Sequence, residues 1–198
     1  MRTVLILNPV AGRSLLAETQ EEPQSIEEEI CSALRVYHFE PEVWYTTLED
    51  PGERMARPAV DEHIDLVIAA GGDGTVHAVA SGLIGGESTL GIIPVGTMNN
   101  LARSLGIPLS VEAACTALAW GETCTIDVGL INGQVFLEVA GIGLEASLFP
   151  AGEELKKTGL LSTVQGMIMG LISLLTFKPT RLKISFDEKK CAHMMPFR

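Results

Sequence analysis

The chain has 198 residues, 46% hydrophobic and 20% charged, with a formal net charge of −11 at pH 7. This composition predicts a globular protein long enough for one full domain and part of a second. The negative charge argues against nucleic-acid binding, which needs a basic face. The four cysteines form no C-x-x-C pair and no zinc-finger spacing, and the first apolar run is too short for a signal peptide. We therefore expect a cytoplasmic protein with reduced thiols.

The charge is unevenly distributed along the chain. Residues 1–150 hold 6 Arg, no Lys and 21 acidic residues, whereas residues 151–198 hold 8 Lys or Arg and 4 acidic residues. A basic C-terminal part can face anionic lipid, so peripheral contact with a membrane surface is one interpretation. Random variation of the surface explains the asymmetry equally well, and both interpretations stay open.

Apolar strands and helices alternate over the first 122 residues. Strands are predicted at 3–7, 42–47, 66–70 and 89–93, and helices at 25–38, 51–62, 76–83, about 98–105 and 111–120. The helix at residue 25 opens with an S-x-x-E capping box. Strands that alternate with helices imply parallel pairing, so we predict a three-layer α/β sandwich with a mostly parallel sheet.

The pattern changes near residue 122. Two strand-like stretches, 123–130 and 134–139, flank Asn132-Gly133, which is a strong hairpin signal. Helices are predicted at about 144–157 and 160–177 and a strand at 181–186. We predict a first domain over 1–122 and an incomplete β-rich second domain with a helical insertion over 123–198. The apolar run 160–177 is of marginal length for a membrane span, and a buried helix is the favoured interpretation.

Glycine-containing loops follow the first, third and fourth predicted strands. Their sequences are NPVAGR (8–13), GGDGT (71–75) and PVGTMN (94–99). In parallel sheets the carboxyl ends of the strands share one edge, where ligands bind. Glycines leave backbone N–H groups uncovered, and the start of a helix adds its dipole, so the loops together predict a phosphate site. The alternative for GGDGT is a glycine-rich connection without a ligand.

Several side chains in these loops are candidates for specific roles. Asp73 needs Mg²⁺, water or a hydroxyl donor between itself and a phosphate, or else it caps the following helix, for which Thr75 is also a candidate. Arg13 is the only cation in the three loops and is therefore the natural phosphate partner. Thr97 and Asn99 supply hydroxyl and amide donors at a helix start, and both can instead be simple caps.

Other motifs carry less weight. The G-x-G-x-x-A run at 141–146 matches a dinucleotide fingerprint, but it follows a hairpin strand and lacks the acid expected about 20 residues further on. P-loop, zincin and hydrolase-elbow motifs are absent. Of the four histidines only His77 lies near the proposed site, and a structural role is the favoured interpretation.

The ordered set NP-x-x-G (8–12), GGDGT (71–75) and P-x-G-T-x-N (94–99), followed by AGIG (140–143), resembles the diacylglycerol kinase catalytic-domain family. That family includes sphingosine kinases and bacterial soluble lipid kinases. GGDGT alone is shared with NAD kinases, whereas its combination with P-x-G-T-x-N points to the lipid-kinase branch. The resemblance covers about residues 1–186. It implies an ATP-binding α/β domain, a β-rich domain, a lipid substrate that enters between them, and Mg²⁺ with the ATP.

The resemblance also implies which residues contact ATP. They lie in the three loops and at the end of the second strand: Asn8, Pro9, Gly12, Arg13, Thr46, Gly71, Gly72, Asp73, Gly74, Thr75, Gly96, Thr97 and Asn99.

The chain departs from the family pattern at several positions. Asn100 stands where the family often has Asp, and Glu138 and Glu145 stand where it usually has Asn and Asp. The family's general base lies in a D-G-E motif nearer the C-terminus, and no D-G-E occurs in these 198 residues. We therefore expect the chain to be a shortened form or to have incomplete chemistry. It should bind nucleotide, with the general base beyond Arg198 and weak or no kinase activity unless a longer C-terminal part exists.

Two alternatives to a lipid kinase stay open. One is a soluble phosphoryl transferase of the NAD-kinase type, and the other is a non-catalytic module that senses nucleotide or lipid. The sequence does not reveal the acceptor lipid, the Mg²⁺ ligands or the oligomeric state.

Overall fold

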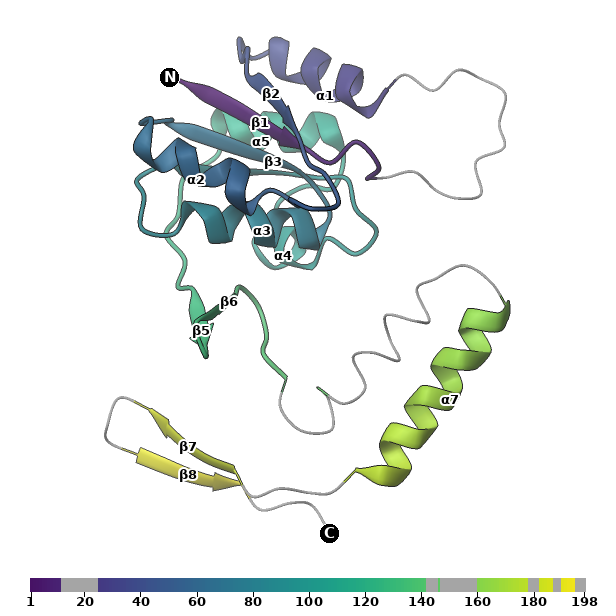
Figure 1. Cartoon of the computed structure of the whole chain (residues 1–198). Helices are drawn as coiled ribbons and strands as arrows, with labels where there is room; N and C mark the ends of the chain where they lie inside the picture. The colour runs from purple at the N-terminus through teal and green to yellow at the C-terminus, as the bar shows by residue number, and fades with distance from the viewer. Residues whose placement is uncertain (12–24, 142–145, 147–159, 178–181, 187–189, 195–198) are drawn as a thin grey trace. The chain divides into compact units, whose positions relative to one another are not determined.

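The computed structural model describes residues 1–11, 25–141, 146, 160–177, 182–186 and 190–194 (Figure 1). The chain divides into two compact units, Met1–Glu138 and Val139–Arg198. The helix expected at about 144–157 lies outside the described residues.

The first unit is built on a four-stranded sheet with the strand order β2-β1-β3-β4. Its strands are β1 (Thr3–Leu7), β2 (Glu42–Tyr45), β3 (Leu66–Gly71) and β4 (Thr89–Pro94). All three neighbouring pairs are parallel. Every residue of β3 is buried, as its unbroken apolar sequence predicts for a central strand of a covered sheet. The predicted parallel α/β fold is confirmed.

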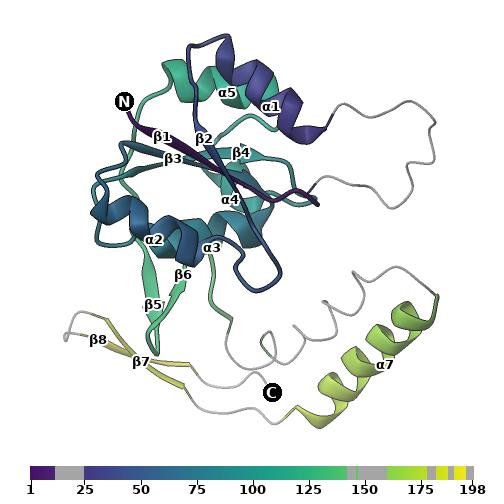
Figure 2. The same ribbon diagram turned by 45° about the horizontal axis from the view of Figure 1, so that its top comes forward.

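Helices cover both faces of this sheet (Figures 1 and 2). They are α1 (Ile26–Arg35), α2 (Glu53–Asp61), α3 (Asp73–Leu83), α4 (Asn100–Ser104) and α5 (Val111–Trp120). Leu5 and Leu7 of β1 pack with α1 and α5, whereas Val4 and Ile6 pack with α2, α3 and α4. Successive side chains of a strand point to opposite faces, so one apolar strand supplies both halves of the core.

Ser25 caps α1, as the S-x-x-E sequence predicts. The Oγ atom of Ser25 accepts the backbone N–H of Glu28 at 3.2 Å. Ser110 caps α5 in the same way, with its Oγ accepting the N–H of Ala113 at 3.3 Å.

A hairpin follows α5. Strands β5 (Gly129–Ile131) and β6 (Gln134–Phe136) pair antiparallel across Asn132 and Gly133. The φ angles of these two turn residues are 51° and 78°, as a two-residue turn of type I′ requires. The hairpin is therefore confirmed, with strands shorter than predicted.

The second unit contains α7 (Leu160–Thr176), β7 (Leu182–Phe186) and β8 (Lys190–Met194). Strand β8 pairs antiparallel with β7. Strand β8 was not predicted, because its KCAHM sequence contains none of the strand-favouring residues Val, Ile, Thr, Tyr, Phe and Trp. Within the described parts of the chain, no helix combines the length and the apolar content needed to cross a membrane.

The expectation that α7 is buried is wrong. Among its described side chains, seven large apolar ones are 46–76% exposed: Val164, Met167, Ile168, Leu171, Ile172, Leu174 and Leu175. At 100° per residue these positions form one continuous face of the helix. The opposite face holds Gly166, which is buried, and Met169 and Gly170, which are partly buried. The helix therefore exposes seven large apolar side chains on one face and covers the face that carries its two glycines.

Candidate functional site

The loops at the carboxyl edge of the sheet are fixed side by side by the backbone. Each pair of neighbouring strands makes one more hydrogen bond beyond its last paired residues. These bonds are Thr46 N–H to Leu7 O at 2.9 Å, Asn8 N–H to Ala70 O at 2.9 Å and Val95 N–H to Gly71 O at 3.1 Å. The parallel ladder thus continues into the loops, so the sheet itself sets the spacing of the predicted site residues.

Asn8 joins the first loop to the second. Its Nδ2 donates to the Oγ1 of Thr75 at 3.2 Å, and its Oδ1 accepts the N–H of Val10 at 3.1 Å. The side chain of Thr75 folds back over Gly71, where an added Cβ would lie 2.5 Å from the Thr75 Cβ. Glycine at position 71 is therefore needed for Thr75 to reach Asn8, and Thr75 is buried as a result.

The second and third loops touch through two glycines. A Cβ added to Gly96 would lie 2.3 Å from the Cα of Gly72, closer than real Cβ contacts come. Asn99 holds Gly96 in place, because its Oδ1 accepts the Gly96 N–H at 3.0 Å and its Nδ2 donates to the Gly96 carbonyl at 2.8 Å. Asn99 is buried and has a left-handed backbone with φ 52°, which asparagine tolerates better than most residues. Its amide is thus engaged in shaping the loop.

Asp73 links the second loop to α4. Its Oδ1 accepts the N–H of Leu101 at 3.3 Å, in the first turn of α4. Asp73 is the first residue of α3, and Gly72 is the N-cap residue. The expectation that Thr75 caps this helix is therefore wrong, because α3 begins two residues earlier. Asp73 caps α4 and leaves the start of its own helix without a side-chain cap.

The start of α3 is consequently open to a ligand. Gly72 has no side chain to accept the first N–H groups of the helix, and no side-chain cap bond is formed. Gly74 is exposed, and a Cβ added there would meet nothing within 4 Å. The first N–H groups of a helix and its dipole favour an anion. The protein's own packing does not require glycine at position 74, so the space it leaves suits an approaching phosphate.

The remaining predicted residues occupy different environments. Pro9 and Thr97 are exposed at the same edge, and Thr46 is buried beside Leu7. Gly12 and Arg13 lie outside the described residues. Sequence reasoning missed two participants, Val95 and Leu101, because each contributes a backbone N–H whose partner is set only by the tertiary fold.

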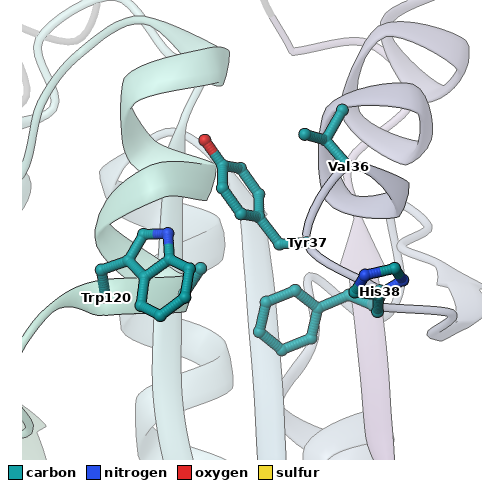
Figure 3. Close-up of a pocket in the computed structure, with 6 residues that line it drawn as sticks. Val36, Tyr37, His38 and Trp120 are labelled. Atoms are coloured by element: carbon teal, nitrogen blue, oxygen red, sulfur yellow. The ribbon is translucent and has the colours of Figure 1, made fainter.

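The hollows in the first unit lie at the other edge of the sheet. One of about 270 Å³ is lined by Val36, Tyr37, His38, Phe39, Ala119 and Trp120, at the ends of α1 and α5 (Figure 3). A second hollow of about 380 Å³ reaches Met1 and Thr3 at the start of β1. Neither is lined by a predicted site residue, and the candidate site is recognised by its backbone donors.

Comparison with known proteins identifies relatives of this chain. The sequence pattern of the diacylglycerol kinase catalytic domain matches residues 2–131. A diacylglycerol kinase of Bacillus subtilis (strain 168) is 33% identical over 193 residues, covering 95% of this chain and 60% of that protein. A diacylglycerol kinase of Staphylococcus saprophyticus is 27% identical over 191 residues, with coverage of 95% and 60%.

Solved structures also match members of this family. A Bacillus anthracis (strain Sterne) protein assigned to the diacylglycerol kinases superposes with a TM-score of 0.67 at 27% identity, covering 97% of this chain and 61% of that one. A second structure, of a diacylglycerol kinase from the same strain, gives a TM-score of 0.56 at 28% identity, with coverage of 69% and 48%. The chain thus spans about 60% of the length of the curated relatives it matches.

Proposed function

The chain belongs to the diacylglycerol kinase catalytic-domain family, and on that premise we propose that it binds ATP at the carboxyl edge of the sheet. We further propose that the protein transfers the γ-phosphoryl group of ATP to a hydroxyl of diacylglycerol or a related lipid. The observation that carries the proposal is the open start of α3, where no side chain caps the first backbone N–H groups and Gly74 leaves free space beside two bonded loops.

The proposed nucleotide contacts follow from this geometry. The N–H groups of Asp73, Gly74 and Thr75 point along the axis of α3 and suit the phosphate chain. Thr97, which is exposed, suits a second contact from the third loop. Arg13 and Gly12 complete the assignment through the family resemblance, with Pro9 and Thr46 at the margins of the site.

Mg²⁺ fits the same site through Asp73. One carboxylate oxygen of Asp73 is engaged with the Leu101 N–H, which leaves Oδ2 for a hard cation. A cation there would separate the carboxylate from the phosphates, and when bound it would neutralise charge that develops on the γ-phosphoryl group. The protein's part is to hold Asp73 rigidly between the second loop and α4.

Phosphoryl transfer places few chemical demands on the protein beyond positioning. The lipid hydroxyl oxygen forms the new bond to the γ-phosphorus, the bond from that phosphorus to the β–γ bridging oxygen breaks, and ADP leaves. The hydroxyl proton passes to a general base. We assign residues 1–122 to the nucleotide domain and residues 123–198 to part of the lipid-substrate domain, and we assign the base to none of these residues.

The acceptor lipid makes contact with a membrane surface a natural part of the proposal. The exposed apolar face of α7 supports it, as does the sequence from 155 to 186, which contains five Lys or Arg and no acidic residue. An apolar helix face in a basic segment suits the surface of an anionic bilayer. Co-sedimentation with phosphatidylglycerol vesicles should fall when Leu171→Glu and Leu175→Glu are combined, and should fall less in Gln165→Glu, which adds one charge at the margin of that face beside Ile172.

Calorimetric titration of the purified chain with Mg-ATP tests the nucleotide site. We expect saturable binding at micromolar to millimolar ATP, with weaker binding in EDTA. Absence of binding at millimolar ATP, in a sample whose thermal unfolding shows that it is folded, overturns the proposal.

Labelled-ATP assays test the acceptor. Label transferred to diacylglycerol in vesicles supports the lipid kinase, and label transferred to NAD supports a soluble phosphoryl transferase instead. ATP binding with no labelled product from either acceptor, even for the full-length gene product, supports a non-catalytic module.

A further inference from the structure

The segment that leaves β6 is attached to the two helices that begin at the candidate nucleotide site. We name residues 135–138, which are the last two residues of β6 and the two that follow it, the strap. Helices α3 and α4 start at the second and third loops, and Asp73 joins these starts through the Leu101 N–H. The strap runs from α3 to α4, and the first unit ends with it at Glu138.

The first attachment is a hydrogen bond from His77, one turn into α3. The Nε2 atom of His77 lies 3.0 Å from the carbonyl oxygen of Val135, which is 58 residues away in sequence. Because a carbonyl only accepts, Nε2 must carry the proton in this contact. The bond selects the tautomer of His77 that is protonated at Nε2, and it fixes the position of the strap along α3.

The second attachment is apolar. Leu137 is partly buried and packs against the core cluster that includes Val76 of α3 and Leu101 of α4. This cluster also contains buried residues of β1, β3 and β4, so Leu137 packs against the core to which the first turns of α3 and α4 contribute. Movement of the first turns of α3 and α4 would therefore change the core surface against which Leu137 packs.

The third attachment is weaker. The Oγ of Ser104 lies 3.3 Å from Oε1 of Glu138, and also 3.1 Å and 3.0 Å from the carbonyl oxygens of Asn100 and Leu101. One hydroxyl proton serves these three acceptors, so the contact to Glu138 is only partly formed. Of the two polar attachments, the His77 bond is the firmer.

We propose that the strap couples the nucleotide site to the second unit and that His77 is the positioning residue that fixes it. This inference rests on the proposed function. An anion bound at the start of α3 draws the first turns of α3 and α4 together around Asp73. The His77 hydrogen bond and the packing of Leu137 transmit that ordering to the strap. The strap leads directly to Val139, where the second unit begins. His77 does not touch the reacting atoms in this proposal.

Hydrogen exchange on the whole chain, with and without Mg-ATP, tests the proposal. In the wild type we expect Mg-ATP to slow amide exchange in the loops (71–75 and 96–101) and also in the strap. In His77→Ala we expect the loops to remain protected by ATP, the strap to lose its ATP-dependent protection, and its nucleotide-free exchange to be about fivefold faster. The ATP dissociation constant should change by less than about threefold, since no nucleotide contact is removed.

Two variants separate positioning from a general packing role. His77→Gln keeps an N–H donor and should restore the ATP-dependent protection of the strap. Ser81→Ala lies one turn further along α3, where Ser81 bonds only to the His77 carbonyl, and it should behave as wild type. Strap protection that survives in His77→Ala, or a loss that Gln does not restore, overturns the role of His77.

The outcome also distinguishes this inference from the proposed function. Failure of the wild type to bind ATP overturns the proposed function and the coupling with it, while nucleotide-free exchange still tests whether His77 fixes the strap. ATP binding that protects the loops and never the strap overturns the coupling alone.

Discussion

The two edges of the parallel sheet differ in how they are built. At the carboxyl edge, the loops are bonded to one another and two glycines approach at backbone distance. At the amino edge, the ends of α1 and α5 leave a hollow of about 270 Å³ lined by aromatic side chains such as Tyr37 and Trp120 (Figure 3). Parallel strands followed by helices bring helix starts and their N–H groups to the carboxyl edge only. The carboxyl edge is therefore marked as a phosphate site by its directed backbone donors, which the amino edge does not have.

The largest effect is expected from closing the contact between the two glycine loops. In Gly96→Ala the added Cβ would overlap the Cα of Gly72, which is backbone and cannot rotate away. We expect a loss of about 1–3 kcal/mol in the free energy of unfolding, as for other overpacked sites. ATP affinity should fall at least about tenfold because both loops move, a change of about 1.4 kcal/mol in binding free energy. Urea unfolding and calorimetric titration measure the two effects, and unchanged ATP affinity would show that the loop contact is not needed.

A slightly smaller effect is expected at Asn99. Asn99→Ala removes both hydrogen bonds to Gly96 and places alanine at φ 52°, costing about 2 kcal/mol of stability. ATP affinity should fall with it because the third loop loosens. The matched control is Asn132→Ala, which has a similar φ of 51° in the exposed hairpin turn and should cost stability without changing ATP affinity. Equal losses of affinity in the two variants would contradict a specific role for Asn99.

Gly74→Ala should separate stability from binding. The protein leaves room for the new methyl group, and alanine favours helix over glycine by up to about 1 kcal/mol, so the thermal midpoint should rise. The methyl group would occupy the space proposed for phosphate, so ATP affinity should fall about tenfold. A variant that is more stable and binds ATP as tightly as wild type would contradict the proposed phosphate position.

At the helices that line the amino-edge hollow, we expect stability to depend on alkaline pH and not on ATP. Burial raises the pKa of Cys115 on α5 to about 11, with the nearby Cys31 and Glu29 adding to the rise. The folded state therefore holds this proton more tightly than the unfolded state, whose thiol has a pKa of 9.0. The stabilising contribution is complete below pH 9 and is lost as the pH rises towards 11. Thermal midpoints over this range should fall less steeply in Cys115→Ala, and an unchanged slope would exclude the thiol as the cause.

The smallest effect is expected at the amino-edge hollow itself. Trp120 is 78% exposed, so Trp120→Ala should change the free energy of unfolding by about 0.5 kcal/mol or less. ATP affinity should remain within about twofold of wild type, because no donor of the carboxyl edge is altered. A loss of ATP affinity comparable to that in Gly96→Ala would contradict our placement of the nucleotide at the carboxyl edge.

The sequence by itself determined the layered fold and the edge that holds the candidate site. Unbroken apolar strands such as β3 are buried on both faces, and their alternation with amphipathic helices leaves few arrangements other than a parallel sheet. The three glycine loops could be placed together because parallel strands end at one edge. The hairpin at Asn132-Gly133 followed from turn chemistry alone.

Only the tertiary structure decided which groups those loops engage. Asp73 caps α4 and not its own helix, and the side-chain amide of Asn99 hydrogen-bonds to Gly96. Local sequence does not encode these partners, because the loop conformation brings them together. The exposure of α7 and the pairing of β8 depended likewise on neighbours, since an apolar helix or a short polar strand fits several environments. Local patterns indicate which elements form and in what order, whereas a hydrogen bond such as His77 to Val135 joins residues 58 apart and exists only once the chain has folded.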